Sequence, residues 1–178
     1  MADRPFIPVR IAVLTVSDTR TAADDKSGQV LADRVVAAGH ELVDRAIVSD
    51  DVDRIRDQVR AWAGRADIDA IISTGGTGLT GRDVTVEAMR GLFDKEIDGF
   101  SVAFHMISWP KIGTSTVQSR ATAGIVQGKY VFCLPGSPGA CRDGWDEILL
   151  PQLDYRHMPC NFVEIMPRLD EHLKRTRG

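Results

Sequence analysis

The stretch "AIISTGGTGLTGRDVT", residues 70–85, joins a short apolar run to a glycine-rich loop. A short apolar run that ends in turn residues is typical of a strand buried on both faces. Glycine lets the backbone adopt conformations closed to other residues and lets an anion approach the chain closely. If a helix begins after this loop, its unpaired N–H groups add to the attraction for an anion. The stretch therefore predicts a buried strand that ends in an anion-binding loop.

Apolar runs and helical patterns alternate along the rest of the chain. Apolar residues recur at helical spacing before Gly39 and again before Gly64, and glycine is well placed to end a helix. Strands separated by such helices imply crossover connections and a mainly parallel sheet, so we predict an α/β fold in a single domain, residues 1–178. The predicted strands are 11–16, 41–48, 69–74 and 129–134.

Other parts of the chain carry weaker patterns. Residues 85–109 are typical of one or two helices broken near Gly99, and 111–128 of an ordered connection or short strands. We expect the two ends, 1–9 and 167–178, to be flexible, since they show no such apolar pattern.

Composition narrows the class of protein. The 22 Lys and Arg residues against 25 Asp and Glu give a net charge of −3, so no basic field favours nucleic acid. Cys133, Cys141 and Cys160 lack metal-site spacing and are predicted to be free thiols. The N-terminus lacks the apolar core of a signal peptide, and no apolar run is long enough to cross a membrane. We expect a cytoplasmic protein without membrane contact.

Small polar residues follow three of the predicted strands. They begin at Ser17, at Thr74 and at Pro135, where the chain reads "SDT", "TGGTG" and "PGSP". Ligands of an open parallel sheet bind outside the carboxyl ends of its strands. Each loop taken alone is equally consistent with a tight turn, but the three together favour one site that holds phosphate by backbone amides.

Other nucleotide and nucleophile motifs fit less well. The string from Gly76 to Gly81 matches the dinucleotide pattern G-x-G-x-x-G, but "RD" follows before any helix, and Glu96 and Asp98 lie in a helix or turn pattern rather than at a strand end. A nicotinamide site is therefore the weaker alternative. No P-loop motif occurs, and Ser137 lacks the glycine that a nucleophile elbow needs two residues earlier.

Two aspartates are candidates for magnesium binding. Asp83 follows the glycine loop and Asp50 follows the second predicted strand, so both are expected at the same edge of the sheet. A carboxylate beside a bound phosphate needs a cation, and Mg²⁺ is commonly held by one or two carboxylates plus phosphate oxygens. The alternative is that each aspartate only caps the helix that follows it, near Val84 and near Val52.

Five stretches together resemble one known family: "IAVLTVSD", "IISTGGTGLTGRDVTVEAM", "DGF", "GTSTVQSRATAG" and "LPGSPGAC". In order and spacing they are similar to the molybdenum cofactor biosynthesis proteins of the B and Mog type, which include the G domain of gephyrin. The resemblance covers about residues 10–153. It implies a three-layer α/β/α sandwich that binds molybdopterin and, in active members, adenylylates it with ATP and Mg²⁺, releasing pyrophosphate.

The resemblance also implies roles for individual residues. Asp83 would be the essential catalytic carboxylate and Asp50 a second one, and both would hold Mg²⁺. The nucleotide phosphates would be bound by the glycine loop, which comprises Thr74, Gly75, Gly76, Thr77 and Gly78. Molybdopterin and its phosphate would be bound by Ser17, Ser119, Arg120, Pro135, Gly136 and Ser137.

The same resemblance implies an assembly. It points to a homotrimer or a hexamer made of two trimers, and the apolar stretch 100–109 is too hydrophobic for a free surface. A downstream molybdate-inserting protein is an expected partner. The intact "GRDVT" favours an active enzyme, while a non-catalytic molybdopterin carrier and a gephyrin-like interaction scaffold remain the alternatives.

Overall fold

A six-stranded sheet forms the centre of the protein in a computed structural model that describes residues 3–175. The strand order is β2-β1-β3-β6-β5-β4. β2, β1, β3 and β6 are parallel, whereas β5 and β4 run antiparallel to their neighbours, so the mainly parallel sheet is confirmed. The strands are β1 Arg10–Val16, β2 Glu41–Val48, β3 Ala70–Thr74, β4 Lys95–Glu96, β5 Thr122–Val126 and β6 Lys129–Leu134.

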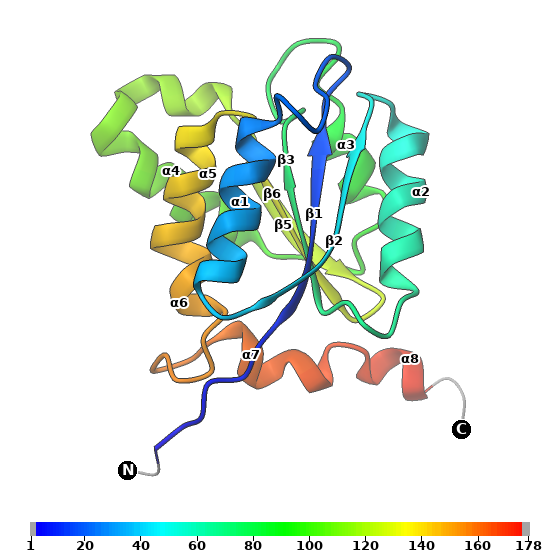
Figure 1. Cartoon of the computed structure of the whole chain (residues 1–178), viewed down its shortest axis with the longest axis vertical. Coiled ribbons are helices and arrows are strands. Elements are labelled where there is room, and N and C mark those ends of the chain that lie inside the picture. Colours follow the sequence, from blue (N-terminus) through cyan, green and yellow to red (C-terminus); the bar gives the residue numbers. More distant parts are fainter. Residues whose placement is uncertain (1–2, 176–178) are drawn as a thin grey trace.

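Helices cover both faces of this sheet and make the expected three layers (Figure 1). One face carries α1 (Lys26–Ala37), α4 (Asp98–Ile112) and α5 (Pro138–Gly144); the other carries α2 (Val52–Ala63) and α3 (Thr85–Arg90). Among the described helices, none combines the length and the apolar character that a membrane span needs. The shorter helical segments are η1 Gly113–Gln118, η2 Trp145–Leu149, α6 Leu150–Gln152, α7 Phe162–Ile165, η3 Met166–Arg168 and α8 Glu171–Arg175.

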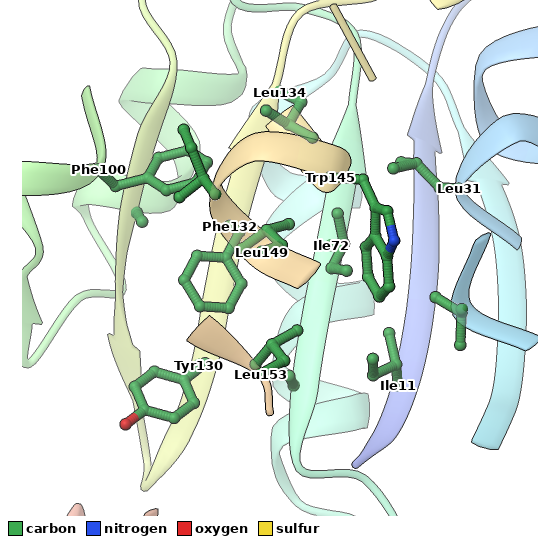
Figure 2. Close-up of a cluster of buried hydrophobic side chains, with 14 of the residues drawn as sticks. Ile11, Leu31, Ile72, Phe100, Tyr130, Phe132, Leu134, Trp145, Leu149 and Leu153 are labelled. Carbon is green, nitrogen blue, oxygen red and sulfur yellow. The ribbon is translucent and has the colours of Figure 1, made fainter. Parts of the chain in front are cut away.

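The apolar runs of the sequence result from burial on both faces of the sheet. Ile11 and Val13 point into the cluster under α1 and α5, while Ala12 and Leu14 point into the cluster under α2. Side chains alternate between the faces of a strand, so a strand covered on both sides needs apolar residues at every position. Figure 2 shows the first cluster, in which Trp145 is almost fully buried.

The helix caps decide which aspartates are structural. Asp25 caps α1 by accepting a hydrogen bond from the Gly28 N–H at 2.9 Å. Asp51 caps α2 by accepting one from the Arg54 N–H, also at 2.9 Å. The cap of α2 is thus Asp51, not Asp50, and α3 begins at Thr85 without any side-chain cap. Capping therefore accounts for neither Asp50 nor Asp83.

The weakly patterned segments form helices and two short strands, β4 and β5. Two helices, α3 and α4, cover the stretch 85–109, but the break lies at residues 91–97, and Gly99 belongs to the first turn of α4. The stretch 111–128 contains the end of α4, then η1 and β5. The expectation of flexible ends stays a prediction; in their described parts, the Val9 N–H donates to His40 at 3.1 Å, and the chain continues through η3 and α8. Residues 1–2 and 176–178 lie outside the described residues.

Candidate functional site

The loops after the parallel strands meet in one pocket of about 310 Å³. The strand order places β1 between β2 and β3, so the connection after β1 goes to one face of the sheet and the connection after β2 goes to the other. Such a reversal opens a crevice at the carboxyl ends of the strands. These strand ends lie at the top of Figure 1. We call this the strand-end pocket; it is lined by Thr15, Val16, Ser17, Thr19, Arg20, Ser27, Asp50, Thr74, Gly75, Gly76, Asp83 and Gly136.

The glycine loop has the conformation that an anion site requires. Gly75 and Gly76 have φ of +97° and +71°, a region that favours glycine. A Cβ at Gly75 would collide with the Val16 carbonyl oxygen, and one at Gly76 with the Thr85 hydroxyl, so the fold itself requires both glycines. Within the described residues, the N–H groups of Gly76, Thr77 and Gly78 donate to no acceptor. Three successive free N–H groups are suited to bind phosphate oxygens.

Asp50 and Asp83 lie on either side of this loop. The Asp50 Oδ1 atom is 3.3 Å from the position of a Gly76 Cβ, and the Asp83 Oδ2 atom is 2.7 Å from that of a Gly78 Cβ. Asp50 Oδ2 accepts a hydrogen bond from the Asp18 N–H at 3.0 Å, and Asp83 Oδ2 accepts one from the Thr80 hydroxyl at 2.7 Å. Asp83 is thus oriented by its own loop and Asp50 by the loop that follows β1, and both line the same pocket.

The electrostatics of this pair fit a divalent cation. Burial, and then the negative charge of Asp83, raise the pKa of Asp50 above its ordinary value. No group of three or more His, Cys, Asp or Glu side chains suited to a metal occurs in the described residues, so within them a cation at this pocket would meet two carboxylates, Asp50 and Asp83. Mg²⁺ is commonly bound in this way, by one or two carboxylates with phosphate and water oxygens as its other ligands.

Arg120 holds the walls of the site rather than lining the strand-end pocket. Its Nε donates to the Gly78 carbonyl at 3.0 Å and its Nη2 to the Asp83 carbonyl at 3.2 Å. The guanidinium also pairs with Glu87, which lowers the pKa of that carboxyl. The side chain that we expected on molybdopterin is thus engaged with the glycine loop and the Asp83 backbone.

A second hollow of about 230 Å³ lies across the turn that follows β6. Pro135 and Ser137 border it, while Gly136 of the same turn borders the strand-end pocket. The Ser119 hydroxyl oxygen is buried in this region with no hydrogen-bond partner in the described part of the chain. We call this the side pocket; it is lined by Phe104, Ser108, Lys111, Ile112, Thr116, Ser119, Pro135, Ser137, Gly139, Ala140 and Asp143.

The predicted site residues therefore fall into three groups. Ser17, Asp50, Thr74, Gly75, Gly76, Asp83 and Gly136 line the strand-end pocket. Ser119, Pro135 and Ser137 line the side pocket. Thr77, Gly78 and Arg120 line neither and form the wall beside Asp83.

Three residues of the site had been given no role of their own from the sequence. Arg20 and Ser27 line the strand-end pocket, and Asp18 positions Asp50 through reciprocal hydrogen bonds of 3.0 Å between each carboxylate and the other backbone N–H. Asp18 belongs to the small polar motif after the first strand and Arg20 follows that motif directly, whereas Ser27 lies in the first turn of α1 and has no signal of its own in the sequence.

The dinucleotide alternative is not favoured by the topology. The glycine loop leads into α3 only at Thr85, and Glu96 lies in the antiparallel edge strand β4, while Asp98 begins α4. A Rossmann site needs its acidic residue at the end of a neighbouring parallel strand.

A larger hollow, of about 510 Å³, is lined by Lys95 and Arg168 among others. None of the described residues that line it belongs to a loop after a parallel strand, so it lies apart from the predicted phosphate site.

Comparison with known proteins agrees with this geometry. A family model described as "Probable molybdopterin binding domain" matches residues 12–155. Molybdenum cofactor biosynthesis protein B of Escherichia coli (strain K12) is 51% identical over 157 residues, which cover 88% of this chain and 92% of that protein. A crystal structure of a molybdenum cofactor biosynthesis protein B superposes with a TM-score of 0.83 at 41% identity, covering 96% of this chain and 99% of the other.

A solved structure of MogA gives a TM-score of 0.70 at 30% identity, covering 81% of this chain and 99% of MogA. The match to the family model, the identity to protein B and the shared three-layer fold agree with one another. The chain belongs to the family of molybdopterin-binding domains that contains the molybdenum cofactor biosynthesis protein B.

Proposed function

We propose that this protein acts in molybdenum cofactor biosynthesis as a molybdopterin adenylyltransferase, which uses ATP and Mg²⁺ and releases pyrophosphate. One observation carries the proposal: Asp50 and Asp83 face one pocket, on either side of a loop with three free N–H groups. Phosphoryl-group transfer depends mainly on positioning and on neutralising charge, and it needs no covalent nucleophile from the protein.

The residues of the chain divide this work. The N–H groups of Gly76, Thr77 and Gly78 bind the phosphates of ATP, and their positions are set by the fold before any ligand arrives. Asp50 and Asp83 would hold Mg²⁺, which when bound neutralises the charge on the phosphate oxygens. Arg120 and Thr80 keep the Asp83 loop in place.

The side pocket is the proposed site of the pterin. It is a concave, mainly apolar hollow, and the buried Ser119 hydroxyl can donate to or accept from a polar ring atom. The turn of Pro135, Gly136 and Ser137 separates it from the strand-end pocket, so a ligand phosphate that passes Gly136 reaches the glycine loop.

The exposed face of α4 supports an oligomer. Val102, Met106 and Trp109 share one side of the helix, and more than half of each side chain is exposed. Phe104, on the opposite side, is in the core. A helix that is apolar all round is usually buried, so we propose that a second copy of the chain covers this face, in the trimer or hexamer that the family resemblance implies.

Light scattering at micromolar concentration tests this assembly. We expect a trimer or hexamer for the wild type, and a smaller species when Met106 and Trp109 on the exposed face are replaced by Glu. A monomeric wild type would contradict the proposal. A cytoplasmic location and a downstream molybdate-inserting partner belong to the same proposal, supported by the three free cysteines and by the family.

The decisive experiment uses the purified protein with molybdopterin, ATP and Mg²⁺. We expect adenylylated molybdopterin and pyrophosphate in equal amounts. Binding of molybdopterin without turnover would favour a non-catalytic carrier. If neither binding nor turnover occurred, an interaction scaffold that has kept the fold would be favoured.

A further inference from the structure

Arg20 has a position in the strand-end pocket that the proposed adenylylation does not yet use. It lies in the loop between β1 and α1, and its side chain is partly buried. Its Nη1 donates to the Ser27 hydroxyl at 3.2 Å, and its Nη2 approaches the Gly136 carbonyl oxygen to 3.5 Å. Arg20 is also the one basic residue among the described residues that line this pocket.

The charge of Arg20 is available to a ligand. The two other arginines near the glycine loop are neutralised, because Arg82 pairs with Asp18 and Arg120 pairs with Glu87. Within residues 3–175 no carboxylate lies within ion-pair distance of Arg20; after hydrogen bonds from Thr21, its charge contributes only at longer range to the lowered pKa of the exposed Asp24. A guanidinium keeps its charge at any physiological pH and has five N–H donors in a plane, which suits two oxygens of one phosphate.

The strand-end pocket is therefore divided into an acidic and a basic part. The acidic part is next to Gly76, where the Asp50 carboxylate lies. The basic part is next to Gly136, which packs against Gly75 with a Cβ position 3.3 Å from the Gly75 Cα. Since Gly136 also belongs to the turn at the side pocket, the basic part is the one that a ligand in the side pocket reaches first.

We propose that Arg20 binds the terminal phosphate of molybdopterin, while the carboxylate end of the pocket serves ATP. This assignment rests on the proposed function. In the reaction, an oxygen of the pterin phosphate forms a bond to the α-phosphorus of ATP, and the bond from the α-phosphorus to the β-phosphate oxygen breaks to release pyrophosphate. Two anions must meet in this step, and Arg20 offsets their repulsion by neutralising the attacking phosphate without taking or giving a proton.

Binding in the absence of ATP tests Arg20 separately from catalysis. Molybdopterin and its dephosphorylated form are titrated into the wild type, Arg20→Gln and Arg20→Lys. Arg60→Ala is the control, because Arg60 is exposed on α2 and its one ion pair among the described residues is with the exposed Asp57. We expect the wild type and the control to prefer the phosphorylated ligand, and Arg20→Gln to lose about 10–100-fold of that preference, the usual range for a charge-assisted hydrogen bond.

Arg20→Lys keeps the charge but loses the planar guanidinium, so its preference for the phosphorylated ligand should lie between those of the wild type and Arg20→Gln. Arg20→Gln keeps an N–H donor for Gly136, so the melting temperature should change little. An equal phosphate preference in the wild type and Arg20→Gln would overturn the assignment, and so would the absence of any preference in the wild type.

Turnover distinguishes failure of this assignment from failure of the proposed function. In an active protein, Arg20→Gln should raise KM for molybdopterin about 10-fold or more and leave KM for ATP within about twofold. If KM for ATP rises instead, Arg20 binds the nucleotide and the assignment is wrong. If the wild type binds molybdopterin but forms no product, the proposed function fails while the ATP-free titration still decides the role of Arg20.

Discussion

Asp50 and Asp51 are adjacent in sequence, yet the structure gives them different tasks, and this provides a sharp test of the site. Asp51 caps α2 through the Arg54 N–H and does not line the strand-end pocket. Asp50 faces that pocket, and its carboxylate accepts from the Asp18 N–H. We therefore expect Asp50→Asn to remove activity and Asp51→Ala to remove stability.

The two magnitudes follow from these contacts. Loss of an N-cap side chain costs about 1 kcal/mol, which corresponds to about 2–4 °C in Tm for a chain of this size. Loss of one preorganised charge at a reacting phosphate costs about 10²–10³-fold in rate, or about 3–4 kcal/mol. The amide oxygen of Asp50→Asn still accepts from the Asp18 N–H, so the loop should keep its shape.

Asp50→Asn should also be no less stable than the wild type. The pKa of Asp50 is raised in the folded protein, so the folded state binds its proton more tightly than the unfolded state does. As pH rises above the unfolded value of about 3.9, this difference lowers the stability, and the full cost is present once pH exceeds the folded pKa. At neutral pH the neutral amide avoids that cost.

The assay compares pyrophosphate release and Tm for the wild type and both variants at neutral pH. We expect Asp51→Ala to melt lower and to keep its turnover at a temperature where it is folded. We expect Asp50→Asn to melt at or above the wild-type temperature and to lose nearly all turnover. If Asp51→Ala lost turnover as severely, or if Asp50→Asn kept it, the reasoning from the pocket geometry would be refuted.

Three further predictions concern the residues around this pair and the buried His40. Asp83→Asn should lower the pKa of Asp50, because the negative charge that repels its carboxylate is removed. A carboxyl carbon NMR titration measures this pKa, and an unchanged value would show that the two side chains do not interact. Arg120→Ala should lower the free energy of unfolding by about 2 kcal/mol in a denaturant titration, because the carbonyls of Gly78 and Asp83 lose a charged donor. A loss below about 0.5 kcal/mol would contradict the role of Arg120 in holding the glycine loop. His40 is buried and accepts a hydrogen bond from the Val9 N–H, and burial lowers its pKa. The free energy of unfolding should therefore fall by up to about 1.4 kcal/mol per pH unit as pH drops below about 6.5, because the unfolded state then binds the proton more tightly. His40→Gln should flatten this pH dependence, and an equal slope in the variant would exclude His40 as its cause.

Local chemistry in the sequence was sufficient to predict most elements of the fold. The run that became β1 is apolar at successive positions because the strand is covered on both faces, whereas a strand with one face in water would alternate apolar and polar residues. Gly64 ends α2 as expected. The glycine loop and the two aspartates were predicted for the same reason, because residues that follow parallel strands gather at one edge of the sheet.

Contacts between distant segments could not be predicted in this way. The choice between Asp50 and Asp51 as helix cap depends on the backbone rotation after β2, and either residue satisfies the sequence rule. The edge strand β4 is two residues long, which is too short for any periodicity, and it forms only because β5 offers it hydrogen bonds.

The same limit applies to the arginines of the site. Arg20 and Arg120 stand in loops 100 positions apart, and nothing in their neighbours in sequence shows which of them faces a ligand. Arg120 is engaged by carbonyls of the glycine loop and by Glu87, whereas Arg20 points to Ser27 and Gly136 without a carboxylate partner in the described residues. Composition and spacing determine which groups are present, but only the tertiary structure decides which charges are already neutralised, because that depends on contacts between parts of the chain that the sequence places far apart.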